Sequence, residues 1–204
     1  MPDIPSLEQS VKSQFERVFP VSDWELFKEM AEASFSEAAF LKTSAFKKVA
    51  DNKKLLARNS RKRLLIGVGA ELLLKAVYLK TGYCINKPKV PKHTGPTFPF
   101  KLAATDVPLN KADTYMLDHL ITGLPRIVTL QDLQVVTEGL RIAKVFRNKE
   151  GHVVTRTHKF ESQSFRAIEC ALVALYADVF GQQLMVRFSF EPKEKAAWKT
   201  TKVT

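Results

Sequence analysis

The sequence predicts an all-α protein, an antiparallel helical bundle with a proline-rich insertion. Three observations support this fold class. Apolar residues recur at alternating steps of three and four over long stretches, glycine is scarce at 8 of 204 residues, and strand-like alternation is confined to Met185–Phe190. A chain of this length can bury a real core. We expect one helical domain over residues 22–191, preceded by a loosely ordered lead-in (1–21) and followed by a basic tail (192–204).

The net charge of +11 and a pI near 9.7 favour a polyanionic partner, with nucleic acid first and an acidic membrane surface second. The alternative is a basic domain without such a partner. The positive charge is concentrated: residues 1–41 carry eight acids against three bases, whereas residues 42–63 carry nine bases against Asp51 alone. A local positive surface is therefore expected.

Cys84 and Cys170 show neither C-x-x-C spacing nor a nearby histidine, so the sequence indicates two free thiols and no zinc or redox site. The first ten residues lack the apolar core of a secretory signal. The most apolar run, Leu64–Leu79, is short for a membrane span and is broken by Glu71 and Lys75. We expect a cytoplasmic protein with no membrane contact and no cofactor.

The first long helix is predicted to begin after an N-cap at Ser22 or Asp23 and to continue to about Val49. Its buried stripe comprises Trp24, Phe27, Ala31, Ser34, Ala38, Leu41, Ala45 and Val49. Three further aromatics, Phe35, Phe40 and Phe46, are predicted to widen that face, which suits several neighbours or a protomer interface.

A turn at Asn59 and Ser60 is predicted to precede the central helix, about 61–81, which is apolar nearly all round and ends at Gly82. Glu71 and Lys75 lie four residues apart, acid first. This spacing indicates a partly buried ion pair, and the alternative is a role in substrate binding.

Five prolines in residues 83–108 exclude a long helix and predict a loop or extended segment. This segment is either a positively charged rim of an active site or a packing flap. Beyond it, Asn110 is expected to cap a short helix through Ile121, and Thr129 with Asp132 resembles a capping box for the next helix. A short strand or extended segment is expected at 184–190.

The sequence R-N-K-E-G-H, at Arg147–His152, lies between the two best-patterned helices of the chain. Their stripes are Leu133, Val136, Leu140 and Ala143 before it, and Phe165, Ile168, Leu172, Leu175 and Val179 after it. The first stripe continues onto Arg147, a charged residue at a core-facing position. We therefore expect Arg147, Asn148 and His152 at a helix junction.

These three residue types suit metal-free phosphoryl transfer. A guanidinium binds and stabilises a phosphate, an imidazole moves protons near neutral pH, and an amide orients either group. No carboxylate cluster accompanies them, so the sequence gives no support for cleavage by two metal ions. RNA supplies its own nucleophile, the 2′-hydroxyl, which DNA lacks. The pattern favours RNA as substrate.

On an unbroken helix, Arg147 and His152 would point roughly 140° apart. Two arrangements bring them together: Gly151 ends the helix and redirects His152, or two copies of the motif meet across a two-fold interface. The alternative is structural, with both side chains serving only the helix terminus. His158 is the alternative to His152 as the histidine that transfers protons.

The R-N-x-x-x-H pattern between the last two long helices, together with G-A-E-L-L-L-K-A-V-Y-L-K-T-G-Y at Gly69–Tyr83, resembles the HEPN superfamily of prokaryotic defence and toxin domains. The resemblance covers roughly residues 23–181. It implies a HEPN-type bundle and a metal-independent endoribonuclease that acts as a homodimer, with paired motifs in one cleft. Arg147 and His152 take the positions of the catalytic pair, and Asn148 that of the polar residue after the arginine. Gly151, just before His152, departs from the helical continuity that many relatives keep.

The resemblance also implies a toxin–antitoxin or antiphage role with a cognate antitoxin or defence-system partner. Some HEPN proteins bind without cleaving, so a non-catalytic nucleic-acid or partner-binding module remains the main alternative. An adaptor that docks a protein through its Phe-rich first helix is a third. The residues expected to bind RNA are Lys53, Lys54, Arg58, Arg61, Lys62, Arg63 and Lys149.

Overall fold

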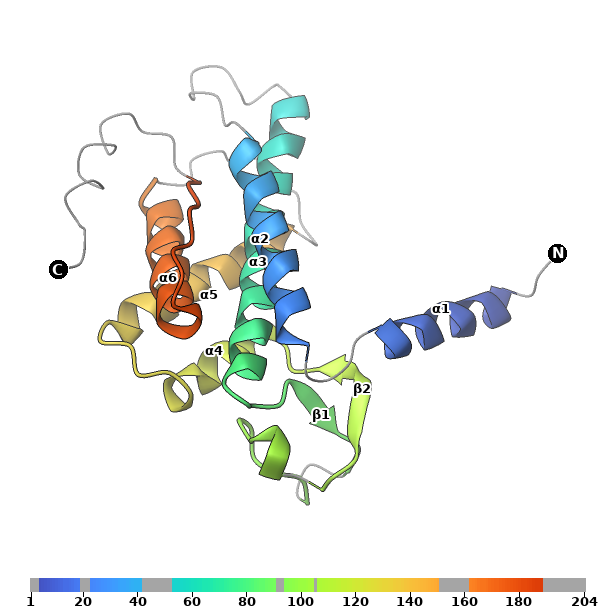
Figure 1. Cartoon of the computed structure of the whole chain (residues 1–204). Helices are drawn as coiled ribbons and strands as arrows, with labels where there is room; N and C mark the ends of the chain where they lie inside the picture. Colours follow the sequence, from blue (N-terminus) through green and yellow to red (C-terminus); the bar gives the residue numbers. More distant parts are fainter. Residues whose placement is uncertain are drawn as a thin grey trace. The chain divides into compact units, whose positions relative to one another are not determined.

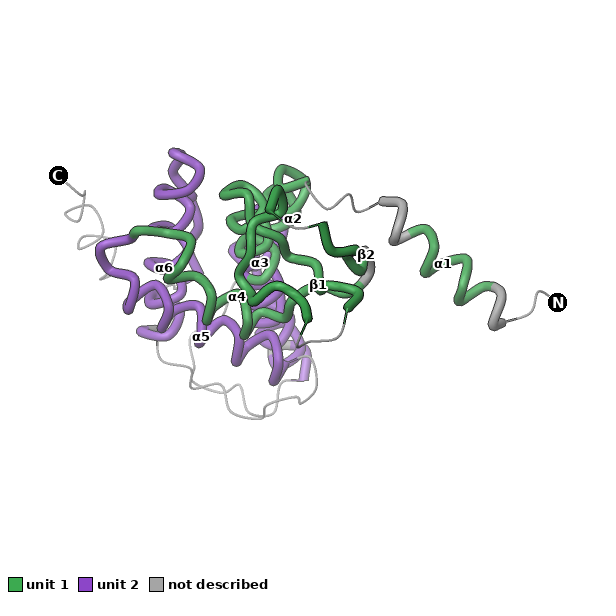
Figure 2. Tube along the Cα trace, turned by 90° about the horizontal axis from the view of Figure 1, so that it is seen from below, with its two compact units in different colours: residues 1–31, 71–129 green, residues 32–70, 130–204 purple. Residues whose placement is uncertain are grey.

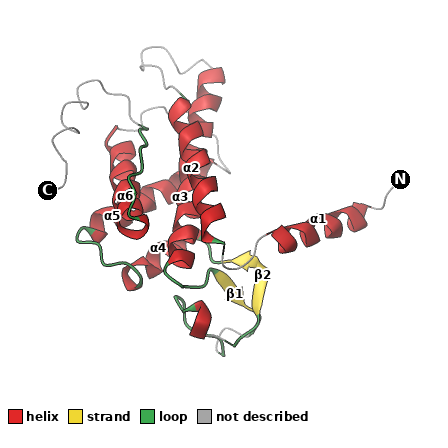
Figure 3. Cartoon of the chain, in the orientation of Figure 1, coloured by secondary structure: helices red, strands yellow, loops and turns green. Residues whose placement is uncertain are grey.

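The computed structural model describes residues 4–18, 23–41, 53–90, 94–104, 106–150 and 162–188 and is mostly helical there (Figures 1 and 3). The helices are α1 (Ile4–Val18), α2 (Trp24–Phe40), α3 (Lys53–Lys80), α4 (Leu117–Gly123), α5 (Leu133–Glu150) and α6 (Ser162–Phe180). Two short strands, β1 (Asn86–Pro88) and β2 (Leu109–Thr114), and two 3-10 turns (Leu102–Ala104 and Leu124–Arg126) lie between α3 and α5. The mainly helical fold class is confirmed, with the addition of a small antiparallel sheet.

The chain divides into two compact units (Figure 2). Unit 1 comprises Met1–Ala31 and Glu71–Thr129, and unit 2 comprises Glu32–Ala70 and Leu130–Thr204. The first part of α3 thus belongs to unit 2 and its last part to unit 1. The candidate motif belongs to unit 2.

In unit 1, the predicted start of α2 and the predicted end of α3 are confirmed. Asp23 accepts a hydrogen bond from the backbone N–H of Leu26 through its side chain (3.1 Å), so it is the N-cap of α2. At the end of α3, Gly82 has a φ of +83°, a left-handed conformation that favours glycine. Glu71 and Lys75 form the expected ion pair at 3.2 Å, mostly buried.

The proline-rich segment packs into unit 1 through aromatic contacts. The ring of Phe98 stacks on Tyr78 with centroids 5.3 Å apart and lies against Tyr115 at 4.0 Å. The Tyr78 hydroxyl donates to the carbonyl of Leu120 at 2.7 Å, and burial raises its pKa far above the usual range. Phe100 is also buried. These contacts agree with the packing alternative for this segment.

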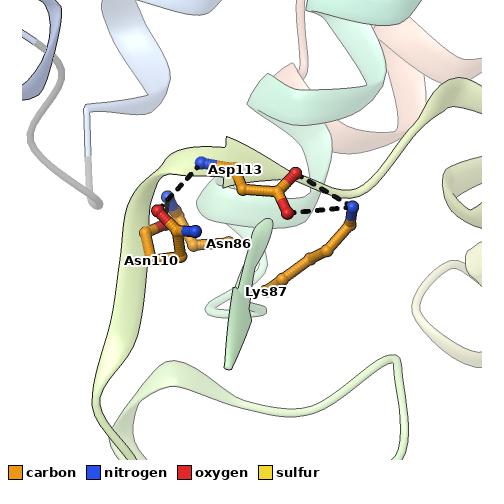
Figure 4. A network of polar contacts seen from close by, with 4 residues as sticks. All are labelled: Asn86, Lys87, Asn110 and Asp113. Atoms are coloured by element: carbon orange, nitrogen blue, oxygen red, sulfur yellow. Dashed lines mark hydrogen bonds and ion pairs between the residues drawn. The ribbon is translucent and has the colours of Figure 1, made fainter. Parts of the chain in front are cut away.

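The sheet of unit 1 explains why the predicted cap at Asn110 is wrong (Figure 4). Asn110 lies in β2, where its carbonyl accepts from the Asn86 side chain (2.8 Å) and its side chain accepts from the Asp113 N–H (3.3 Å). Lys87 bridges to the Asp113 carboxylate at 2.9 Å. The short helix, α4, begins only at Leu117, and its N-cap residue Met116 makes no side-chain cap. The Asn110 side chain therefore makes its hydrogen bond within β2, seven residues before α4 begins.

Three other boundaries differ from the predictions. Residues 4–18 of the expected lead-in form α1, and its Leu7 and Val11 side chains are exposed. The predicted turn at Asn59–Ser60 is wrong, because α3 is helical through both residues. The first long helix, α2, ends at Phe40, and Leu41 lies in a bend, so the predicted helix is wrong at Leu41. Residues 42–49 of the predicted helix lie outside the described residues.

Unit 2 is built on helices that cross in antiparallel directions. A Cβ at Gly139 of α5 would lie 2.4 Å from the Ala167 carbonyl oxygen of α6, and Phe146 meets Phe165 with ring centroids 5.5 Å apart. Residue numbers therefore rise along α5 where they fall along α6, so the two helices are antiparallel. Phe35 of α2 is buried as predicted, whereas Phe40 is 84% exposed, so the predicted widening of the face is wrong at Phe40. Phe46 lies outside the described residues.

Residues 181–188 follow α6 as an extended segment of unit 2. Leu184, Val186 and Phe188 are buried while Met185 and Arg187 are exposed, so the predicted alternation holds without an assigned strand. The N–H of Phe188 donates to the Glu169 carboxylate. The remainder of the expected strand, and the basic tail at 192–204, lie outside the described residues.

None of the helices in the described residues has the length and apolar character needed to cross a membrane.

Candidate functional site

Arg147 and Asn148 lie in the last turn of α5. The stripe that predicts a core-facing Arg147 is confirmed, since Val136, Leu140 and Ala143 are buried and Arg147 is partly buried. The Nη1 atom of Arg147 donates to the Oδ1 atom of Asn148 at 3.2 Å. The two side chains are thus neighbours, and the amide oxygen orients the guanidinium.

The backbone of α5 approaches α3 closely at Arg147. A Cβ added to Gly67 would lie 2.5 Å from the backbone nitrogen of Arg147, 2.6 Å from its Cβ and 2.7 Å from the carbonyl oxygen of Ala143. These distances are far below any normal Cβ contact, so only glycine permits this approach. Gly67 thereby fixes the distance between the two helices at the position of Arg147.

Glu150, at the end of α5, is held by two donors from α3. Its Oε1 atom lies 2.5 Å from Nε of Arg63, and its Oε2 accepts from the Ser60 hydroxyl at 2.6 Å. The Arg63 and Glu150 side chains are only 4% and 3% exposed. A buried charge is tolerated when it is paired in this way. The R-N-K-E-G-H motif therefore contains a buried anchor as well as the predicted chemical groups.

Two of the predicted RNA-binding residues are buried inside unit 2, so their prediction as surface contacts is wrong. Arg63 is committed to Glu150. Lys62 is 1% exposed, donates to the Phe188 carbonyl at 2.7 Å and lies over the Phe165 ring at 5.7 Å. Burial lowers the pKa of Lys62 from 10.5 to about 8, and the nearby Glu169 carboxylate opposes that shift. Their basic side chains serve the packing of the unit.

The other predicted contacts differ in accessibility. Lys53, Lys54 and Lys149 are exposed, and Arg58 is partly buried. Arg61 is exposed and forms an ion pair with Glu37. The positive surface that unit 2 offers at these positions is therefore smaller than the charge run predicts.

His152 lies outside the described residues, as do Gly151 and His158. The structure therefore places two members of the predicted catalytic set, Arg147 and Asn148, side by side. The position of His152 stays a prediction.

Sequence reasoning missed Gly67 and the Glu150 anchor. A glycine inside an apolar helix costs about 1 kcal/mol relative to alanine and often marks a close backbone approach, which was the available signal for Gly67. Glu150 carried a weaker signal, an acid at a helix C-terminus where the macrodipole disfavours it. Among the described residues, no group of three or more His, Cys, Asp or Glu side chains is arranged to hold a metal ion.

No family model matches the chain, and neither a curated protein nor a solved structure matches it.

Proposed function

We propose that this chain is a HEPN-type, metal-independent endoribonuclease that cleaves cellular RNA in the cytoplasm. Support comes from the R-N-x-x-x-H pattern and from the arrangement of its first two members. The observation that carries the proposal is the arginine–asparagine pair itself, hydrogen-bonded at 3.2 Å on a helix end that Gly67 and Glu150 hold against α3. A helix end held in this way presents a permanent positive charge in a defined place.

The proposed reaction is transesterification within the RNA. A base removes the proton of the 2′-hydroxyl, the 2′-oxygen attacks the adjacent phosphorus, and an acid protonates the departing 5′-oxygen. The products are a 2′,3′-cyclic phosphate and a 5′-hydroxyl. Arg147 would stabilise the charge that develops on the phosphate oxygens. His152 would transfer protons, and Asn148 would orient the guanidinium.

We further propose that the active form is a homodimer in which two motifs share one cleft. This part of the proposal rests on the resemblance and on helix geometry: on an unbroken helix Arg147 and His152 would point roughly 140° apart, so the His152 of a second copy would complete the site. The biological role proposed is a toxin or antiphage effector, restrained by a cognate antitoxin or defence-system partner.

The test is incubation of the purified chain with labelled RNA and with DNA of the same sequence, both in EDTA. Cleavage of RNA alone, abolished in Arg147→Ala, supports the proposal. The oligomeric state is measured by light scattering on the same sample, where twice the chain mass is expected. Salt-dependent binding of intact RNA by a folded dimer would instead favour the non-catalytic binding module.

A further inference from the structure

The last turn of α5 is held against α3 at two points one helical turn apart. Arg63 and Gly67 are four residues apart on α3, and they meet Glu150 and Arg147, three residues apart on the antiparallel α5. The last turn of a helix frays readily, because its final carbonyls lack partners within the helix. Two points of attachment, spaced by a turn on both helices, oppose that fraying. The direction in which the Arg147 side chain leaves the helix is thereby fixed.

Of the two points of attachment, the one at Glu150 consists of hydrogen bonds, which are directional. Both of its carboxylate oxygens accept hydrogen bonds, Oε1 from Arg63 at 2.5 Å and Oε2 from Ser60 at 2.6 Å. An acid at a helix C-terminus opposes the macrodipole, and burying its charge has a further cost. An apolar residue would fill the same space without either cost. What the carboxylate adds is a fixed geometry between two donors on one face of α3.

We infer that Glu150 is a positioning residue of the ribonuclease site, which acts through Arg63 and Ser60 to fix the orientation of Arg147 and Asn148. The inference rests on the proposed function. Glu150 itself is shielded from substrate, since its side chain is 3% exposed, and its effect travels through the backbone of the last turn. A misplacement of about 1 Å in a catalytic group can lower a rate roughly a hundredfold.

The test uses two variants of the whole chain. Glu150→Gln keeps the shape and one acceptor but removes the charge. The double variant Arg63→Met, Glu150→Leu removes both charges and refills the volume with apolar atoms, a replacement that often preserves stability. For each variant, kcat and KM for a labelled RNA are measured well below the unfolding transition, together with hydrogen exchange of the backbone amides of residues 147–150.

We expect kcat to fall roughly ten- to a hundredfold in both variants while KM stays within about twofold, because orientation rather than binding is impaired. Exchange of the 147–150 amides should rise at least about tenfold, with no change at residues 136–143. The matched control is Val136→Ala, which removes buried apolar volume near the start of α5, eleven residues before Arg147. It should lower the thermal midpoint and leave kcat unchanged.

Wild-type kcat in the double variant would overturn the positioning role, since the space is filled but the geometry is gone. Unchanged exchange at 147–150 in both variants would overturn it as well. If the wild-type chain cleaves no RNA, the proposed function fails, and faster exchange confined to 147–150 would still establish the anchor. The two failures are therefore distinguishable.

Discussion

Gly67 and Arg147 meet at a backbone distance that excludes any side chain at Gly67. A Cβ there would lie 2.5 Å from the Arg147 nitrogen, and two of its three nearest atoms are backbone atoms that cannot rotate away. Alanine would gain about 1 kcal/mol of helix propensity over glycine. Overpacking against rigid atoms costs about 1–3 kcal/mol, so Gly67→Ala is expected to lower the free energy of unfolding by up to about 2 kcal/mol. Urea unfolding measures this change.

The same substitution should also reduce RNA cleavage, since α5 must move away from α3 at Arg147. Gly69→Ala is the matched control on the same helix. A Cβ there would meet the ring of Phe35 on α2 and would leave the contact between α3 and α5 untouched. If Gly67→Ala and Gly69→Ala reduce the cleavage rate equally, the close approach has no special role at the site.

Lys62 should make stability depend on pH. Its pKa is lowered from 10.5 to about 8 in the folded chain, chiefly by burial. Between these two values the unfolded chain binds a proton that the folded chain does not, so stability rises as pH rises through this window. Below about pH 8 both states are protonated, and this contribution no longer changes.

The measurement is the free energy of unfolding at pH 7.5 and 9.5 for the wild type and Lys62→Met, which lacks the titrating amine. Taking the difference between the two proteins cancels the contributions of the tyrosines and other lysines that titrate in the same range. The wild type should gain stability relative to Lys62→Met on going to pH 9.5. Parallel pH profiles of the two proteins would contradict a lowered pKa for Lys62 in the folded chain.

Asn148→Asp should impair cleavage more than Asn148→Ala. The alanine removes only the hydrogen bond that orients Arg147, for which we expect a drop of roughly three- to tenfold. The aspartate would pair with the guanidinium and repel the phosphate, so a drop of roughly a hundredfold or more is expected. The measured quantity is kcat/KM. Equal rates for the two variants would argue against phosphate binding by Arg147.

Lys53, Lys54 and Lys149 should contribute to RNA affinity without sequence preference. Each is exposed, and each alanine replacement is expected to lower the slope of log K against log salt by about 0.7–1, because one phosphate fewer is neutralised. Arg141→Ala, an exposed charge earlier on α5, is the control. If the triple lysine variant keeps the wild-type slope, RNA does not bind this surface.

The features that sequence predicted correctly depend on local pattern. The helix period places Arg147 on the buried face of α5, and the conformational demand at Gly82 marks the end of α3. Asp23 as a cap and the ion pair of Glu71 with Lys75 arise from interactions within one or two turns. Such interactions can be predicted without knowing the fold.

The features that sequence predicted wrongly depend on partners distant in the chain. Lys62 and Arg63 belong to a run that predicted an exposed charged surface, but their partners, Phe188 and Glu150, lie 126 and 87 residues away. Ser60 indicated a turn by its residue type, yet α3 continues through it and its hydroxyl donates to Glu150, 90 residues away. Tertiary interactions decide these positions, and a local stretch of sequence does not contain them.

The most direct test of the ribonuclease proposal compares wild type with His152→Ala on labelled RNA in EDTA, followed by analysis of the fragment ends. We predict cleavage by wild type alone, leaving 2′,3′-cyclic or 3′-phosphate ends and 5′-hydroxyls. Equal cleavage by folded His152→Ala, or wild-type products with 5′-phosphates, would contradict the proposal.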